Sequence, residues 1–165
     1  KEMNKQGVMI DISHVSDAAF MKVLELSKAP VVATHSSLRH FTPGWERNVS
    51  DEMLIALAEN GGVIQLCFGS DFVANRKDNP DIEVSVKNVV DHIDRVRDLV
   101  GIDHVGFGSD FDGEVPLPED INDVSKFPNL IEELLIRGYT ESEIDKILNE
   151  NILRVWKEVR ALADV

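Results

Sequence analysis

Two histidines follow directly after short apolar runs that are typical of buried strands. His14 comes after a predicted strand at residues 8–13, and His35 comes after a predicted strand at residues 31–34. In a parallel barrel such positions lie at the C-terminal rim of the strands, where active sites are built. Neutral imidazole nitrogens on neighbouring strands can bind one zinc ion. The pair therefore predicts a metal site, whereas a lone histidine would more simply cap the next helix.

Asp110 brings a carboxylate to the end of another predicted strand, at residues 104–108. Side-chain alternation places Gly106 and Gly108 on the same face as Asp110, and we expect these small residues to leave room for a ligand or a water molecule. Beside a zinc-bound water, the carboxylate could accept a proton and pass it to a leaving amine. A turn role is the alternative, because residues 110–113 also form a good turn sequence, in which Asp112 is assigned to the turn.

Arg47 lies in the loop after His35, where its guanidinium could bind a substrate carboxylate through two parallel hydrogen bonds. A surface ion pair is an equally good interpretation of this arginine. The other histidines are predicted to be structural or solvated. His40 lies in a loop, His92 lies inside a helix, and His104 begins a strand at the end away from the predicted site.

The chain alternates strands and helices four times. The predicted strands lie at residues 8–13, 31–34, 63–68 and 104–108, with amphipathic helices after each and further helices from Thr140 onward. Four such units imply right-handed crossovers and a parallel sheet, but four strands cannot close a barrel. Residues 1–165 are therefore predicted to form a single α/β block that corresponds to half of a TIM-type barrel.

Composition and charge exclude several classes of protein. The chain has 165 residues, of which 43% are hydrophobic, and its net charge of -13 would repel nucleic acids and anionic membranes. Neither is expected as a partner, and no apolar stretch is long enough to cross a membrane. Cys67 is the only cysteine and is predicted to be a buried, inert thiol that shares the barrel-facing side of its strand with Gln65. We expect a cytoplasmic protein, with export as the alternative.

Taken in order, these motifs resemble the renal or membrane dipeptidase family. The matching segments are Ile-Asp-Ile-Ser-His-Val-Ser at 10–16, Thr-His-Ser-Ser at 34–37, Arg-Asn-Val at 47–49, Gly-Phe-Gly-Ser-Asp-Phe-Asp-Gly at 106–113, Asp-Val-Ser-Lys-Phe-Pro at 123–128 and Asn-Ile-Leu-Arg-Val at 151–155. They extend over essentially the whole chain. The resemblance implies a (βα)8 barrel with two zinc ions. Members of the family cleave dipeptides, and some accept a D-residue at the C-terminal position or a β-lactam.

The resemblance also implies roles for individual residues. His14 and His35 resemble the two histidines on one zinc ion, Arg47 the arginine that receives the terminal carboxylate of the substrate, and Asp110 the aspartate that contacts the bridging water. The family's first-strand His-x-Asp pair, bridging glutamate and carbonyl-polarising histidine have no counterpart in the sequence. We therefore expect this chain to be the second half of the barrel, strands five to eight, with the N-terminal half absent or carried by a partner chain.

The leading hypothesis is a zinc-dependent dipeptidase in which metal-activated water attacks the peptide carbonyl and Asp110 carries the proton. The chain alone is expected to bind zinc weakly and to be inactive, and its two unpaired sheet edges favour homo-oligomers. Two alternatives remain. One is another metal-dependent amide or ester hydrolase of the same superfamily, and the other is a non-catalytic half-barrel that acts as an assembly module.

Overall fold

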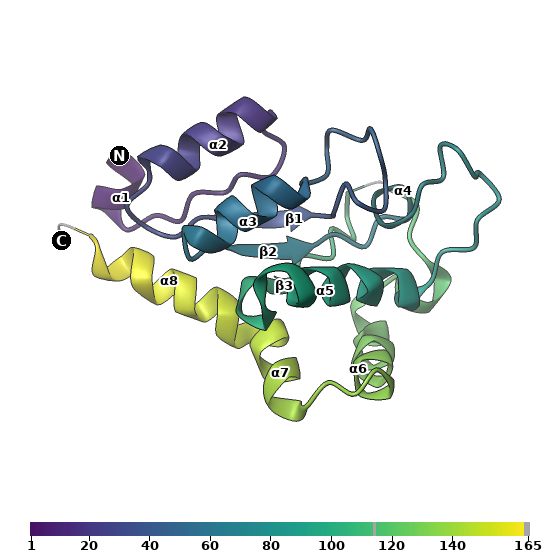
Figure 1. The fold of residues 1–165 in the computed structure, drawn as a ribbon. Coiled ribbons are helices and arrows are strands. Elements are labelled where there is room, and N and C mark those ends of the chain that lie inside the picture. The colour runs from purple at the N-terminus through teal and green to yellow at the C-terminus, as the bar shows by residue number, and fades with distance from the viewer. Residues whose placement is uncertain (114, 164–165) are drawn as a thin grey trace.

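The computed structural model describes residues 1–113 and 115–163, which form an α/β fold built on a parallel sheet. The strands are β1 (Val32–Ser36), β2 (Val63–Leu66) and β3 (Val105–Phe107), hydrogen-bonded in the order β1-β2-β3 (Figure 1). Val32 is in register with Val63, and Ile64 with Val105. The carboxyl ends of the strands therefore lie at one edge of the sheet, as the alternation of strands and helices predicts.

The prediction of four strands is wrong for the first of them, because residues 8–13 do not form a regular strand. This segment lies alongside β1, but it is joined by one parallel bridge between Asp11 and Val32, with Ile12 N donating to Val32 O at 2.8 Å. The Asp11 carboxylate accepts from the amide of Ser13 at 2.9 Å, which closes a tight turn directly after the bridge. An aspartate that bonds its own backbone in this way competes with strand pairing.

Helices connect the strands and extend the chain beyond them. They are α1 (Glu2–Gln6), α2 (Asp17–Leu26), α3 (Asp51–Glu59), α4 (Ser70–Val73), α5 (Val86–Val100), α6 (Phe127–Ile136), α7 (Glu141–Asp145) and α8 (Asn151–Ala161), with 3₁₀ turns at Ile102–His104, Glu119–Ile121 and Val124–Lys126 and a π-helical turn at Lys146–Glu150. No helix within the described residues is both long and apolar enough to cross a membrane.

Side-chain caps mark the starts of three helices. Ser16 accepts a hydrogen bond from Ala19 N at the start of α2, and Ser50 accepts one from Met53 N at the start of α3. Thr140 and Glu143 form a capping box at the start of α7, where the sequence predicts the further helices to begin. These side chains satisfy backbone amides that have no partner within the helix, so the local sequence alone fixes where each helix begins.

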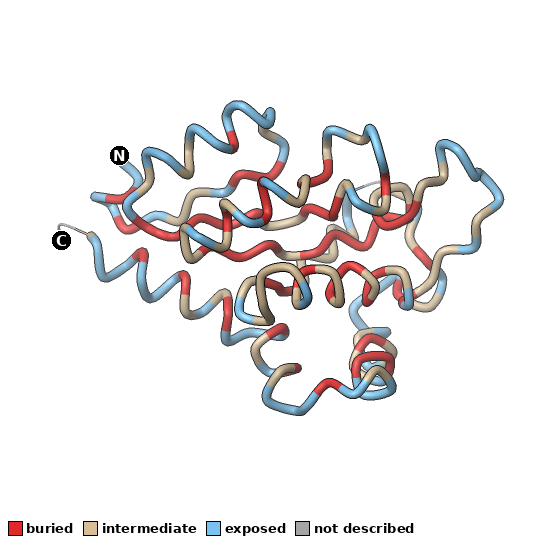
Figure 2. The backbone as a smooth tube through the Cα atoms, in the orientation of Figure 1, coloured by how far each residue is buried: buried red, intermediate tan, exposed pale blue. Residues whose placement is uncertain are grey.

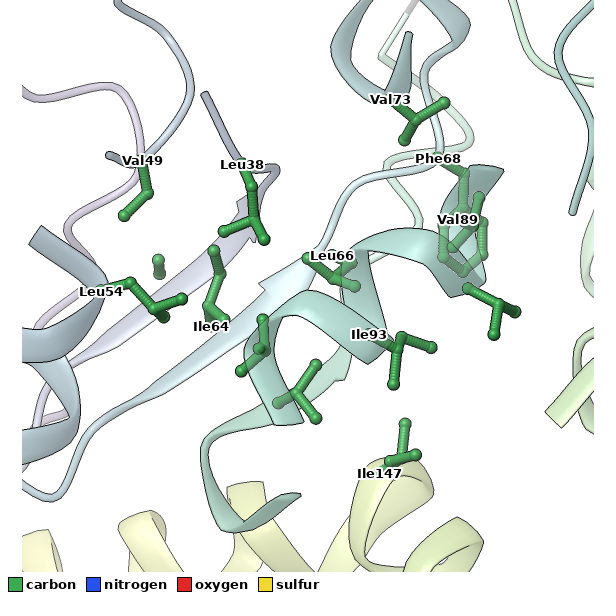
Figure 3. Packing of buried hydrophobic residues seen from close by; sticks show 14 of the residues in the cluster. Leu38, Val49, Leu54, Ile64, Leu66, Phe68, Val73, Val89, Ile93 and Ile147 are labelled. Carbon is green, nitrogen blue, oxygen red and sulfur yellow. The ribbon is translucent and has the colours of Figure 1, made fainter. Parts of the chain in front are cut away.

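The main core lies between the sheet and the helices α3 and α5. Figure 3 shows Ile64 and Leu66 of β2 facing Leu54 of α3 and Ile93 of α5. A smaller cluster forms where α8 packs against the sheet, with Val155 and Val159 of α8 close to Val63. The buried positions follow the strands and the inward faces of these helices (Figure 2). The helices thus hold the strands firmly in place behind the edge from which the predicted site residues project.

Candidate metal and substrate site

His14 and His35 come together at the carboxyl edge of the sheet, as predicted. Their Nε2 atoms lie 2.8 Å apart, and their ring centroids lie 4.8 Å apart with the planes tilted by 50°. Two imidazole nitrogens on one tetrahedral zinc ion would lie about 3.3 Å apart, given a zinc to nitrogen distance near 2.05 Å. A shift of about half an ångström would therefore bring both nitrogens to the spacing of a shared ion.

Irregular backbone aims both imidazoles. Between Ala33 and Ser36, β1 advances three residues while β2 advances two, from Ile64 to Leu66, which is a β-bulge at Thr34 and His35. A bulge redirects side chains, and bulges are common beside active sites. His14 has a φ of 64°, in the left-handed region that non-glycine residues rarely adopt. The alternation expected of a regular strand therefore does not set the direction of either side chain.

A chain of hydrogen bonds runs from Asp11 through Thr34 to His35. Oδ2 of Asp11 lies 2.6 Å from Thr34 Oγ1, and Thr34 Oγ1 lies 2.8 Å from Nδ1 of His35. Partial burial raises the pKa of Asp11, but hydrogen bonds from Thr34 and Ser13 outweigh it and leave the pKa below its usual value. The carboxylate can then only accept, so Thr34 donates to Asp11 and accepts from His35 Nδ1–H. In neutral His35, Nε2 carries a free lone pair.

Arg47 holds His14, the other histidine of the pair. Its Nη2 donates to Nε2 of His14 at 3.1 Å and to the carbonyl of His35 at 2.6 Å, and its Nη1 donates to Ser36 Oγ at 3.1 Å. Because arginine is only a donor, Nε2 of His14 is an acceptor. Both Nε2 atoms are thus acceptors, and Arg47 takes up the lone pair of His14 Nε2. A metal ion between the two rings would take the place of Arg47 on that lone pair.

The local electrostatics keep His14 available as a neutral ligand. Burial lowers the pKa of His14, and the charges of Arg47 and His35 lower it further. The negative charges of Asp110 and Asp11 act in the opposite direction but do not cancel the effect. Since metal binding requires the deprotonated imidazole, this environment favours coordination at neutral pH.

Arg47 is positioned by the loop between β1 and α3. The guanidinium carbon lies 5.5 Å from the centre of the Phe72 ring, at cation–π distance. The neighbouring Asn48 is buried and donates to Thr42 Oγ1 at 2.7 Å and to the carbonyl of Phe72 at 2.8 Å. Arg47 forms no ion pair within the described part of the chain, and its Nε is buried without a hydrogen-bond partner. The surface ion pair considered for this arginine is therefore absent from these residues.

Asp110 lies at the same edge, directly after β3. Its φ is also 64°, and its Oδ2 lies 3.9 Å from the thiol of Cys67. Its charge acts on both His14 and Arg47. A Cβ atom at Gly113 would lie 2.8 Å from Oδ1 of Asp110, so glycine at that position leaves the space that the carboxylate occupies. Two site residues in the left-handed region are strained backbone of the kind that clusters at functional sites.

The expected role of Gly108 is wrong. A Cβ at this position would lie 2.1 Å from the carbonyl oxygen of Thr34 and 2.9 Å from Cβ of Gln65. The missing side chain therefore allows close approach of the protein backbone, and it does not leave space for a ligand. Cys67 is buried, as predicted, and burial raises the pKa of its thiol to about 11. At neutral pH it is a neutral thiol and not a metal-binding thiolate.

The other histidines lie away from the site. His40 is exposed in the loop after β1. His92 is buried in α5, where its Nδ1 accepts from Leu38 N at 3.0 Å and its Nε2 donates to Val73 O at 3.1 Å. His104 donates from Nδ1 to Gly62 O at 2.8 Å. Throughout residues 1–113 and 115–163, no group of three or more His, Cys, Asp or Glu side chains could hold a metal ion. The chain therefore offers two imidazole ligands and leaves the rest of a coordination shell to be supplied.

The sequence reasoning missed Asp11 and Thr34. A signal was present, because Asp11 precedes His14 by three residues and Thr34 directly precedes His35, and polar residues in otherwise apolar strands need a buried or functional partner. In regular strands, however, neighbouring side chains point to opposite faces. Only the bulge in β1 brings Thr34 and His35 to one side.

The model of the family described as membrane dipeptidase (Peptidase family M19) matches residues 1–165. The chain belongs to this family. Dipeptidase ataJ from Aspergillus terreus (strain NIH 2624 / FGSC A1156) is 45% identical over 157 residues, which cover 95% of this chain and 37% of that protein. The resemblance drawn from the motifs is thus confirmed over the whole sequence.

Solved structures of family relatives share the fold. The probable dipeptidase PvdM from Pseudomonas aeruginosa superposes with a TM-score of 0.90 at 29% identity, over 98% of this chain and 53% of that one. A metallo peptidase from Rhodobacter sphaeroides, liganded with a phosphinate mimic of the dipeptide L-Ala-D-Ala, gives a TM-score of 0.87 at 35% identity, over 96% of this chain and 44% of that one. The chain therefore spans about half the length of these relatives, or less.

Proposed function

We propose that this chain carries one zinc-binding position and the substrate-carboxylate site of a zinc-dependent dipeptidase. The observation that carries the proposal is the pair of imidazole nitrogens, His14 Nε2 and His35 Nε2, which face each other at 2.8 Å, with His14 Nε2 accepting from Arg47. A cation would stabilise that pair, and imidazole nitrogens are preferred zinc ligands. The family relative that is bound to a dipeptide mimic supports the choice of substrate class.

We further propose that the complete site requires a second set of ligands from an N-terminal half-barrel outside these 165 residues. Catalytic zinc sites use three or more protein ligands, and this chain contributes two histidines. The family relatives are about twice as long as the matched region or longer. Parallel strands flanked by helices are the repeating unit of a (βα)8 barrel, so these residues fit the second half of one. Homo-oligomerisation through the sheet edges stays a prediction.

The roles of the side chains follow from their positions at the edge of the sheet. Bound zinc would polarise the peptide carbonyl and supply a nucleophilic water at neutral pH. His14 and His35 would hold the ion through Nε2. Arg47 presents a charged guanidinium beside the pair, where a free carboxylate of a dipeptide would form charge-assisted hydrogen bonds. Asp110 holds its carboxylate at the same edge, where it would accept the proton of the attacking water and return it to the leaving amine.

Hydrolysis of L-Ala-D-Ala by an intact family barrel that has this chain as its second half tests the proposal. We expect activity that is lost with a chelator and restored by zinc, and no robust turnover by the chain alone. The substitution Arg47→Met should lower kcat/KM for the free dipeptide about 10- to 100-fold, since a hydrogen bond to a charged group contributes about 1.5–3 kcal/mol. The same substitution should lower hydrolysis of the C-terminally amidated dipeptide clearly less, by the share of Arg47 that holds His14 and the carbonyl of His35.

Arg76→Met is the matched control, because Arg76 is an arginine that pairs with Asp71 at 3.3 Å. It should leave both substrates unaffected. Equal loss of the free and amidated dipeptides in Arg47→Met would contradict the assignment of Arg47. Zinc-dependent cleavage of esters or lactones in place of dipeptides would favour the alternative hydrolase of the same superfamily. An intact barrel that holds no zinc would instead favour the non-catalytic assembly module.

A further inference from the structure

We propose that Asp11 and Thr34 are positioning residues whose hydrogen bonds hold His35 in the Nδ1–H tautomer, so that Nε2 faces the cation as a lone pair. The inference rests on the proposed function and deepens it, because it names the groups that prepare one ligand before the metal arrives. The inference concerns which atoms donate and which accept in the hydrogen bonds among Asp11, Thr34 and His35. It can therefore be tested without any catalytic assay.

The first step of the argument is the anchoring of the Asp11 carboxylate. Oδ1 accepts two backbone amides, from Ser13 at 2.9 Å and from Thr34 at 3.1 Å. Those two amides occupy Oδ1 and hold the carboxylate in one orientation. Oδ2 is then directed at Thr34 Oγ1, 2.6 Å away, a short distance typical of a hydroxyl donating to a carboxylate.

The second step is the direction of the remaining bond. A threonine hydroxyl has one proton, and here that proton is donated to Asp11. The contact of 2.8 Å between Thr34 Oγ1 and His35 Nδ1 therefore needs its proton from the imidazole. Metal-bound histidines commonly donate their second ring N–H to an outer partner, which fixes the tautomer and the orientation of the ring.

The hydrogen bonds that run from Asp11 through Thr34 to His35, called the relay below, are also linked to the backbone of the site. The amide of His35 donates to Ser13 Oγ at 3.1 Å, and Ser13 Oγ lies 3.1 Å from Ser36 Oγ. These contacts tie the segment before His14 to the end of β1, in addition to the backbone bridge between Asp11 and Val32 at the start of that strand. The Asp11 carboxylate thus acts on both ligands, through the turn that precedes His14 and through the tautomer of His35.

The substitution Asp11→Asn separates the positioning role from a merely structural one. The amide oxygen of asparagine must stay on the two backbone N–H groups, so its NH₂ group takes the place of Oδ2 and donates to Thr34 Oγ1. The threonine hydroxyl must then donate to His35 Nδ1. The variant keeps the shape and every contact of the relay but reverses the direction of its hydrogen bonds. The proton of neutral His35 is then on Nε2.

The experiment is long-range ¹H–¹⁵N NMR of the histidine side chains in the labelled, metal-free chain, about two pH units above the ordinary histidine pKa of about 6.5. We expect the Nδ1–H tautomer of His35 in the unchanged chain and the Nε2–H tautomer in Asp11→Asn. Titration with zinc, followed through the same resonances, should show affinity about 10- to 100-fold lower in the variant, the usual cost of losing an outer partner.

Thr34→Ser and Thr34→Val form a second, matched pair. Serine keeps the hydroxyl and should preserve both the tautomer and the zinc affinity, whereas valine has the same shape without the hydroxyl and should lose both. This pair decides the question if Asp11→Asn does not fold. An Nδ1–H tautomer and unchanged zinc affinity in Asp11→Asn or Thr34→Val would overturn the proposal. The expected tautomers in a protein that cleaves no dipeptide would leave the relay standing and remove only the proposed function.

Discussion

His92 should make the chain less stable as the pH falls through the weakly acidic range. Its side chain is completely buried, and both ring nitrogens are used: Nδ1 accepts from the amide of Leu38 and Nε2 donates to the carbonyl of Val73. The Phe41 ring lies against it, with ring centroids 4.4 Å apart. The histidine thus joins the loop that carries Arg47 to helix α4. A second proton on Nδ1 would break the bond to Leu38.

The magnitude follows from the pKa. Burial lowers the pKa of His92 to about 4, from an ordinary value of 6.5. Above pH 6.5 the imidazole is neutral in both the folded and the unfolded chain and has no effect on stability. Below that value the unfolded chain binds a proton that the folded chain excludes, so the free energy of unfolding falls until the pH reaches about 4. The difference corresponds to roughly 3 kcal/mol, with a slope of at most about 1.4 kcal/mol per pH unit.

Urea unfolding of the chain between about pH 7 and about pH 5 measures this effect, in comparison with His92→Gln. Glutamine can offer one acceptor and one donor but does not titrate, so the variant should be less stable at pH 7 and should lose less stability on acidification. We expect the two slopes to differ by about 1 kcal/mol per pH unit near pH 5. Carboxylates titrate in both proteins and cancel in the comparison.

His40→Gln is the control, because it removes an exposed histidine. It also removes the repulsion by His40, which lowers the pKa of His92 less than burial does, so its slope should stay close to that of the unchanged chain. The reasoning is refuted if His92→Gln and the unchanged chain show parallel dependence of stability on pH. That result would mean that His92 takes up its proton within the folded structure.

Three further substitutions, one of them compared with a control on the same helix, test the site and the core. Gly113→Ala should displace the Asp110 carboxylate and lower kcat of an intact barrel on the order of 10²-fold, as measured by steady-state kinetics, because misplacement by about 1 Å has that effect. Leu54→Ala should lower the free energy of unfolding by about 2–5 kcal/mol, whereas Ile55→Ala on the exposed side of the same helix should cost clearly less. Ser50→Ala removes the cap of α3 and should cost about 1 kcal/mol in urea unfolding; values near zero would show that the cap does not stabilise the helix.

The elements that the sequence predicted well are those with local causes. The starts of α2, α3 and α7 depend on a hydroxyl that bonds an amide three residues later, and the apolar spacing of α5 depends on one face of one helix. Such interactions involve only neighbours in the chain. The segment at residues 8–13 failed as a strand because pairing requires a partner, and its own aspartate bonds the following turn.

For the site, the residue types and their positions after apolar runs determined which side chains would meet. His14 follows a segment bridged to β1, His35 lies near the carboxyl end of β1 and Asp110 follows β3, and parallel strands bring their carboxyl ends to a common edge whatever the details of the loops. What only the tertiary structure decided is the direction of each group. The bulge in β1, the left-handed backbone at His14 and Asp110, and the hydrogen bonds through Asp11 and Thr34 depend on contacts between segments more than twenty residues apart. Periodicity describes regular elements alone, so it carries no information about the irregular backbone that aims a ligand.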